Sequence, residues 1–285
     1  MTAANDASQW RLELAREISA VVRRYDGIRA MIVGGSVARG YADEYSDLEI
    51  PLIWETLPPD EVRLKIAAEL GAEFLSPYSG PALEDNLLIH GFQVDFWQGT
   101  LANDEQVIDN VLINYSTDFG ESNFMDTLRA CIPLYGEKII RRWKTRVQEY
   151  PEELAARNIQ LALDAIETSH PKILAARGNL TLFYGQISAL QKQAYLILLA
   201  LNRQYFPSFK WMYRSLETMS IKPQAIESRF RRAFSAPPEE AIEDTASLLV
   251  ETFALAQAQF PHIDYTAARS RIRLTRQAHF AAVHL

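Results

Sequence analysis

Two carboxylates lie one residue apart at Asp47 and Glu49, and the positions around them, Leu48, Ile50 and Leu52, are apolar. This alternation predicts a half-buried strand, in which side chains at i and i+2 share a face. Asp47 and Glu49 therefore point the same way. Because two adjacent carboxylates repel each other unless a cation lies between them, the spacing predicts a metal site.

A third carboxylate, Asp95, lies in the strongly apolar run from Asn86 to Gln98, which predicts one further strand. A charged residue within such a run is costly to bury unless it is paired or bound to a metal. If this strand lies beside the one that carries Asp47 and Glu49, the three carboxylates converge. Such a set of hard oxygen ligands suits Mg²⁺.

A glycine-serine turn precedes the acidic pair. Residues 28–33 are rich in apolar and β-branched side chains, which predicts a buried strand that leads into the turn. Gly34 and Gly35 let the backbone turn sharply and approach a ligand closely. Ser36 is expected to cap a short helix through Arg39, so that free N–H groups and a hydroxyl face phosphate groups.

This order of motifs resembles the nucleotidyltransferases of the DNA polymerase β superfamily. It is most similar to the aminoglycoside (kanamycin) nucleotidyltransferases, which share a serine, an arginine and then Tyr-Ser-Asp-hydrophobic-Glu at the same spacing. The resemblance covers mainly residues 28–98. It implies an enzyme that transfers a nucleoside monophosphate from an NTP, with ATP as the expected donor, to a hydroxyl group.

The resemblance also implies roles for individual residues. The main-chain amides after Gly35 and the side chains of Ser36, Arg39 and Ser46 would contact the triphosphate. Two Mg²⁺ ions would be held by the three carboxylates Asp47, Glu49 and Asp95.

The general base and further phosphate contacts are less clearly marked. Asp95 is one candidate base, and the family places a glutamate from the helical region in this role. Asp164 and Glu167 lie on a predicted helix there, although a surface charge is the simpler interpretation of each. Lys192 and Lys210 are candidate phosphate clamps. The alternative for Lys210, in an aromatic loop, is a core-packing turn with its ammonium group at the surface.

Length and composition fit an α+β chain of two domains. Of the 285 residues, 48% are hydrophobic, which is ample for two cores. We expect a catalytic domain over 1–148, a mixed sheet flanked by helices, and a substrate-binding helical bundle over 149–285. The single Cys131 excludes an internal disulfide framework and a cysteine-rich zinc site. Without a membrane span or a secretory signal, the expected location is cytoplasmic.

The charge is uneven along the chain. Residues 1–150 carry 14 Lys and Arg against 24 Asp and Glu, whereas residues 151–285 carry 15 against 12. This balance disfavours an extended nucleic acid as substrate, because such proteins usually show a basic face. Two basic clusters, at 229–232 and 269–273, are better explained as solvated helix faces. A cationic small molecule would suit the acidic half.

Further elements follow from periodicity and from breaker residues. Pro51 is expected near the end of its strand or at a bulge, because a proline within a sheet removes a hydrogen-bond donor. Helices are expected from about residue 8, over 60–70, 104–114 and 119–131, and from 137. After Pro151 every periodic segment is helical: 152–168, 180–202 and 238–259.

Three functions stay open. The first is nucleotidyl transfer to a small molecule, of which an aminoglycoside-like antibiotic is one candidate. The second is transfer to a protein or to an RNA end, as in toxin–antitoxin modifiers. The third is a nucleotide-binding module without activity, although three retained carboxylates argue against it. The resemblance adds a homodimer as one expectation.

Overall fold

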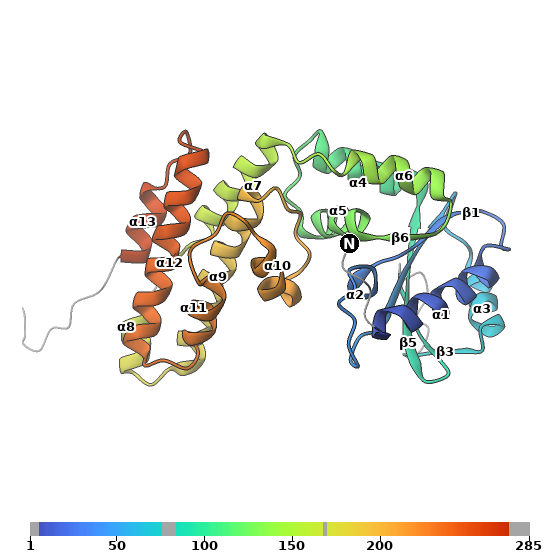
Figure 1. The fold of residues 1–285 in the computed structure, drawn as a ribbon, viewed down its shortest axis with the longest axis horizontal. Coiled ribbons are helices and arrows are strands. Elements are labelled where there is room, and N and C mark those ends of the chain that lie inside the picture. Colours follow the sequence, from blue (N-terminus) through green and yellow to red (C-terminus); the bar gives the residue numbers. More distant parts are fainter. Residues whose placement is uncertain (1–5, 76–83, 168–169, 274–285) are drawn as a thin grey trace, which may run out of the picture. The chain divides into compact units, whose positions relative to one another are not determined.

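The computed structural model describes residues 6–75, 84–167 and 170–273. The chain divides into two compact units, residues 1–149 and 150–285, beside the step from Tyr150 to Pro151 at which the sequence pattern changes. Figure 1 shows a sheet with helices in the first unit and helices alone in the second, which confirms the predicted α+β class. None of the helices in the described ranges is long and apolar enough to cross a membrane.

The first unit is built on a mixed sheet with the strand order β3-β4-β5-β2-β1-β6. Strands β2 and β5 pair in parallel, and the other neighbours pair antiparallel. The strands are β1 (Ile28–Val33), β2 (Leu48–Trp54), β3 (Ala72–Phe74), β4 (Glu84–Ile89), β5 (Phe92–Thr100) and β6 (Ile132–Tyr135).

The two faces of the sheet differ in chemistry. Leu48, Ile50 and Leu52 of β2 are buried in a core with side chains from α1 (Asp6–Val22) and α3 (Asp60–Glu69). The alternate residues, Glu49 and Pro51 among them, point to the opposite face. There α4 contacts β5 and α6 contacts β1. The remaining helices of this unit are α2 (Gly35–Ala38), α4 (Leu101–Leu112), α5 (Phe119–Ala130) and α6 (Glu137–Arg146).

The single strand predicted over 86–98 is wrong, because this run forms a hairpin of β4 and β5. Its ladder closes at Ile89 and Phe92 around the two-residue loop His90-Gly91. Both loop residues have positive φ, 51° for His90 and 79° for Gly91, as a type I′ turn requires. The hairpin brings β4 alongside Asp95.

The expected position of Pro51 is also wrong, because it lies in the middle of β2, an interior strand. The paired residues of β1 and β2 run from Ile28–Trp54 to Met31–Leu52 and do not include Pro51. The irregularity in this ladder lies instead between Ile28 and Ala30. The ladder therefore has a gap at Pro51, which has no N–H to donate, and backbone bonding resumes beyond it, where the Gly34 N–H donates to the Glu49 carbonyl at 3.0 Å.

A buried polar network lies on the core side of the hairpin. Arg63 of α3 forms an ion pair with Asp85 of β4, and the two side chains are each 5% exposed. Gln98 donates to Asp85 at 2.7 Å and accepts a hydrogen bond from the Trp54 indole at 2.7 Å. Each charged group in this network has a partner, which offsets the cost of burial.

The second unit is helical in its described residues. Helices α7 (Glu152–Asp164) and α12 (Pro238–Gln259) pack against α9 (Leu180–Leu201), whose apolar residues form the centre of the core. Glu167 lies beyond the end of α7, so its predicted helical position is wrong, and residue 168 lies outside the described ranges. The other elements are α8 (Pro171–Ala176), η1 (Phe209–Trp211), α10 (Met212–Thr218), α11 (Ile226–Arg232) and α13 (Thr266–Arg273).

Candidate functional site

Two of the predicted carboxylates lie side by side across the sheet. Glu49 of β2 is the register partner of Asp95 in the parallel strand β5, and Asp95 is the partner of Asn86 in β4. Paired residues of adjacent strands are about 5 Å apart and point to the same face. A polar row, Glu49–Asp95–Asn86, therefore crosses three strands on the face opposite the α1 core.

The Glu49 carboxylate also touches the glycine-serine turn. A Cβ added to Gly35 would lie 2.5 Å from Glu49 Oε2, 2.6 Å from Cδ and 2.9 Å from Oε1. Gly35 has φ of +55°, which disfavours any other residue. The turn and the strand thus form one local structure, in which the glycine leaves room for a carboxylate.

Asp95 is 6% exposed and is held by side-chain amides. Asn86 Nδ2 donates to its Oδ1 at 2.9 Å. Gln93 Nε2 lies 3.2 Å from each of its two oxygens. These donors hold the carboxylate oxygens and fix their direction beside Glu49.

Asp47 is half-buried and lies just before β2, where its backbone segment is held by Arg11 of α1. Arg11 donates to the carbonyl of Ser46 at 3.0 and 2.7 Å and to that of Asp43 at 2.8 Å. The Ser46 hydroxyl binds the Asp43 carboxylate at 2.9 Å. Burial lowers the pKa of Arg11, and the negative charges of Asp43 and Asp47 partly offset this effect.

Sequence reasoning missed Arg11, which fixes the approach to the acidic pair. A signal was present, because Arg11 lies three residues after Ser8 and four before Ala15, on the buried stripe of α1. Its guanidinium also stacks over the rings of Trp10, at 4.3 Å, and Phe92, at 5.2 Å. When helical spacing places an arginine on the buried face of a helix, its guanidinium is expected to hold backbone carbonyl groups, as Arg11 does here.

The expected capping role of Ser36 is wrong. Helix α2 begins at Gly35 with Gly34 as its N-cap, and Ser36 lies inside the helix with 6% exposure. The helix starts early because the Gly34 carbonyl accepts the Ala38 N–H at 3.2 Å.

Arg39 is held by two acceptors on the first unit. Its guanidinium donates to the Gly35 carbonyl at 2.8 Å and forms an ion pair with Asp126 of α5. Burial raises the pKa of Asp126, and the positive charge of Arg39 partly offsets that rise. The contacts of Arg39, Ser36 and Ser46 with a triphosphate stay predictions.

In the part of the chain that the structure describes, no group of three or more His, Cys, Asp or Glu side chains is arranged to hold a metal ion. A metal site formed by Asp47 together with Glu49 and Asp95 therefore stays a prediction. The pair Glu49 and Asp95 still fits a divalent cation, because Mg²⁺ is commonly bound by one or two carboxylates together with water and substrate phosphates. Their adjacent register positions supply such a pair.

The other predicted residues lie in the second unit. Lys192 and Lys210 have their ammonium groups over aromatic rings, at 4.9 Å from Phe209 and 5.4 Å from Trp211. Asp164 accepts a hydrogen bond from Gln160, 2.9 Å away. Their roles as phosphate clamps and general base stay predictions.

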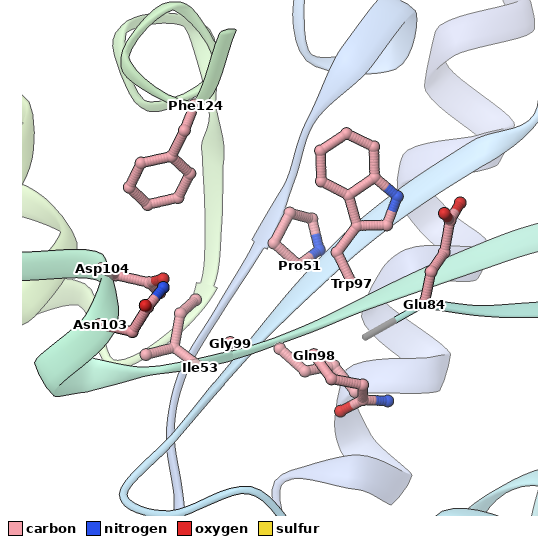
Figure 2. Close-up of a pocket in the computed structure, with 10 residues that line it drawn as sticks. Pro51, Ile53, Glu84, Trp97, Gln98, Gly99, Asn103, Asp104 and Phe124 are labelled. Carbon is pink, nitrogen blue, oxygen red and sulfur yellow. The ribbon is translucent and has the colours of Figure 1, made fainter. Parts of the chain in front are cut away.

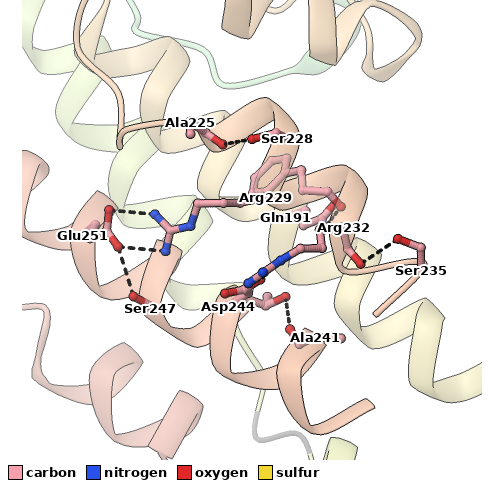
Figure 3. A network of polar contacts seen from close by, with 12 residues as sticks. Gln191, Ala225, Ser228, Arg229, Arg232, Ser235, Ala241, Asp244, Ser247 and Glu251 are labelled. Atoms are coloured by element: carbon pink, nitrogen blue, oxygen red, sulfur yellow. Dashed lines mark hydrogen bonds and ion pairs between the residues drawn. The ribbon is translucent and has the colours of Figure 1, made fainter. Parts of the chain in front are cut away.

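The basic cluster 229–232 is largely neutralised within the second unit, as Figure 3 shows. Arg229 donates to both oxygens of Glu251, at 3.0 and 2.9 Å, and Arg232 pairs with Asp244. The Arg231 guanidinium lies 4.1 Å from the centre of the Tyr213 ring. These contacts agree with the prediction that the cluster is a helix face and not a surface for polyanions.

The face that carries Glu49 and Asp95 continues into a pocket of about 540 Å³. Its floor is the next two rows of the same sheet face, and Figure 2 shows Phe124 and Asp104 at one end and Trp97 and Glu84 at the other. The volume is within the range of small-molecule sites. The lining residues are Pro51, Leu52, Ile53, Glu84, Trp97, Gln98, Gly99, Asn103, Asp104 and Phe124.

Comparisons with known proteins give a family match over part of the chain and a similar solved structure. Residues 124–212 match the family described as "Domain of unknown function (DUF4037)". Among solved structures, the chain is similar to a nucleotidyltransferase-like protein from Exiguobacterium sibiricum 255-15, with 11% identity and a TM-score of 0.41 over 93% of this chain and 77% of that chain. No curated protein matches the chain. The matched family range contains neither Glu49 nor Asp95.

Proposed function

We propose that this protein is a metal-dependent nucleotidyltransferase that moves a nucleoside monophosphate from an NTP to a hydroxyl of a small molecule. The observation that carries the proposal is the contact between the Glu49 carboxylate and Gly35, with Asp95 at the neighbouring register position. A glycine-serine turn and two adjacent acids are thereby joined on one face of the sheet.

In this proposal Glu49 and Asp95, with Asp47 before them, hold the metal ions. The ions neutralise phosphate charge and lower the pKa of the acceptor hydroxyl when they are bound. Gly35 and Ser36 place backbone and hydroxyl groups beside the phosphates, and Arg39 and Ser46 join them. ATP is the expected donor, and Lys192 and Lys210 are further proposed phosphate clamps.

Asp95 is also the proposed acceptor of the hydroxyl proton. Its two amide donors, Asn86 and Gln93, hold the carboxylate in one orientation, which is what proton transfer over hydrogen-bond distance needs. Asp164 and Glu167 remain weaker candidates for the base. Transfer chemistry of this kind depends mainly on positioning and on charge neutralisation.

The charge distribution of the chain supports a small-molecule acceptor over a macromolecular one. The acidic first unit and the paired arginines of the cluster 229–232 provide little basic surface for RNA. An aminoglycoside-like antibiotic is one candidate acceptor. A cytoplasmic location and a homodimer also remain proposals.

The test is transfer of label from α-³²P-labelled NTPs in Mg²⁺ to a panel of small hydroxyl compounds, with pyrophosphate release measured in parallel. Glu49→Gln should abolish both signals. The matched control is Glu55→Gln, because Glu55 is a half-exposed glutamate just after β2 that pairs with Arg29 at 3.3 Å. Equal activity in the two variants would refute the proposed role of Glu49. Label found on protein or RNA alone would show that the acceptor is a macromolecule and not a small molecule.

A further inference from the structure

The pocket beside the acidic row has a chemistry of its own. Register places Pro51 opposite Trp97 in the first row beyond Glu49 and Asp95, and Ile53 opposite Gly99 in the second. Phe124 closes the side opposite Trp97 (Figure 2). Its ring is fixed by an edge contact with the buried Trp143, whose centroid is 6.5 Å away. The walls are thus apolar, aromatic and supported from behind.

One buried acid faces this apolar space. Asp104 is 7% exposed, and both of its carboxylate oxygens would lie 3.0 Å from a Cβ added to Gly99. Within the described ranges its side chain has Asn103 as a hydrogen-bond partner and no Lys or Arg as an ion-pair partner. Burial raises the pKa of Asp104 to about 7.

The surroundings of Asp104 do not supply the missing positive charge. The nearby cations of α6 are already paired, Arg142 with Glu105 and Arg146 with Asp109. Among the lining residues, Glu84 is the other ionisable group, and it accepts a hydrogen bond from Asn86 at 3.1 Å. The pocket therefore offers negative charge and aromatic walls, a combination that selects cations with apolar bodies.

We infer that this pocket binds a small organic cation, with its ammonium group at Asp104 and its ring system between Trp97 and Phe124. A buried carboxylate without a cationic partner is costly, and a bound ammonium group would supply that partner. The ring system would cover Pro51 and Ile53, which form the floor. A polyhydroxylated polycation fits these walls poorly, so this pocket favours a more apolar acceptor than the aminoglycoside-like candidate named above.

The pocket lies close enough to Glu49 and Asp95 to hold the acceptor of the transfer reaction. This part of the inference rests on the proposed function. Asp104 lies over Gly99, four residues along β5 from Asp95. At about 3.3 Å per residue, the two positions are about 13 Å apart along the strand. The acceptor is then an apolar amino alcohol whose hydroxyl and ammonium groups are separated by about this distance.

Binding can be tested without NTP or metal, so that failure of the pocket and failure of the transferase are distinguishable. The probes are 1-naphthylmethylamine and its neutral analogue 1-naphthalenemethanol, titrated calorimetrically into the full chain. At pH 8 the amine should bind about 10- to 100-fold more tightly than the alcohol, as a charged hydrogen bond predicts. Its affinity should fall about tenfold per pH unit below pH 7, as Asp104 becomes protonated.

Asp104→Asn should remove both the preference for the amine and its pH dependence, while the alcohol binds as before. The matched control is Asp109→Asn, an acid on the same helix that pairs with Arg146 outside the pocket; it should behave as wild type. Equal binding of the two probes to the wild type at pH 8, no binding of either, or an amine affinity that does not fall below pH 7 would overturn the inference. The comparison of probes in the wild type decides the matter even if Asp104→Asn does not fold.

Discussion

Replacement of Gly35 by alanine tests how the turn and the acidic strand fit together. The added methyl group would lie 2.5 Å from Glu49 Oε2, whereas ordinary contacts begin at 3.4 Å. The oxygen must therefore retreat by about 0.9 Å, and displacements of about 1 Å at a reacting centre can cost about 100-fold in rate. The positive φ of +55° adds about 1–2 kcal/mol of backbone strain.

Gly71→Ala is the matched control for the backbone strain. Gly71 has φ of +61° and nothing within 4 Å of an added Cβ, so it carries a similar strain without the clash. Gly71→Ala should lose about 1–2 kcal/mol in the free energy of unfolding, measured by urea denaturation, and Gly35→Ala should lose more because it adds the clash with Glu49. Transfer activity should fall about 100-fold in Gly35→Ala alone.

A double-mutant cycle isolates the contact itself. Removal of the Glu49 side chain in the Gly35→Ala background relieves the clash, so the two changes should couple by about 0.5–3 kcal/mol in stability. The reasoning is refuted if Gly35→Ala and Gly71→Ala have equal activity and the cycle gives no coupling.

Three further predictions concern Asp85, Asp104 and Glu49. Asp85→Asn removes the buried carboxylate partner of Arg63 and should cost about 3–5 kcal/mol in urea denaturation. Asp60→Asn, which removes a half-exposed partner of Arg63 at 3.6 Å, should cost less than about 1 kcal/mol; equal costs would contradict the burial argument. Because the pKa of Asp104 is raised to about 7, the folded state holds that proton more tightly than the unfolded state. The free energy of unfolding should therefore fall by about 1.4 kcal/mol per unit as pH rises from about 4 to 7, and this contribution should be absent in Asp104→Asn; parallel pH profiles would contradict it. Glu49→Asp keeps the charge but moves the oxygens by about 1.5 Å, so steady-state turnover should fall about 100-fold, and near-wild-type turnover would exclude a metal role for Glu49.

The local pattern of apolar and polar residues was enough to predict two central strands of the first unit, β1 and β2. The alternation around Glu49 and the largely apolar run 28–33 predicted the correct strands, because the pattern of apolar residues follows from which positions are buried. The parallel pairing that sets Glu49 beside Asp95 could only be supposed. Pairing of distant strands depends on the whole sheet, and no local spacing encodes it.

The errors have local causes that can be named. The run 86–98 conceals a tight turn, because Gly91 and a histidine with positive φ interrupt it without any polar loop. Ser36 has the right residue type for a cap, but the glycine before it already closes the first turn of α2. The pocket around Asp104 was out of reach, since it is assembled from β2, β4, β5, α4 and α5.

Metal binding at the acidic row is the most direct test of the proposed activity. We would titrate Mn²⁺, a cation of similar ligand preference to Mg²⁺, into the protein with a non-hydrolysable NTP and follow free Mn²⁺ by electron paramagnetic resonance. The wild type and Glu55→Gln should bind the ion with equal affinity, and Glu49→Gln and Asp95→Asn should each weaken binding about tenfold or more. Unchanged affinity in both site variants would contradict the proposal that these carboxylates hold the metal.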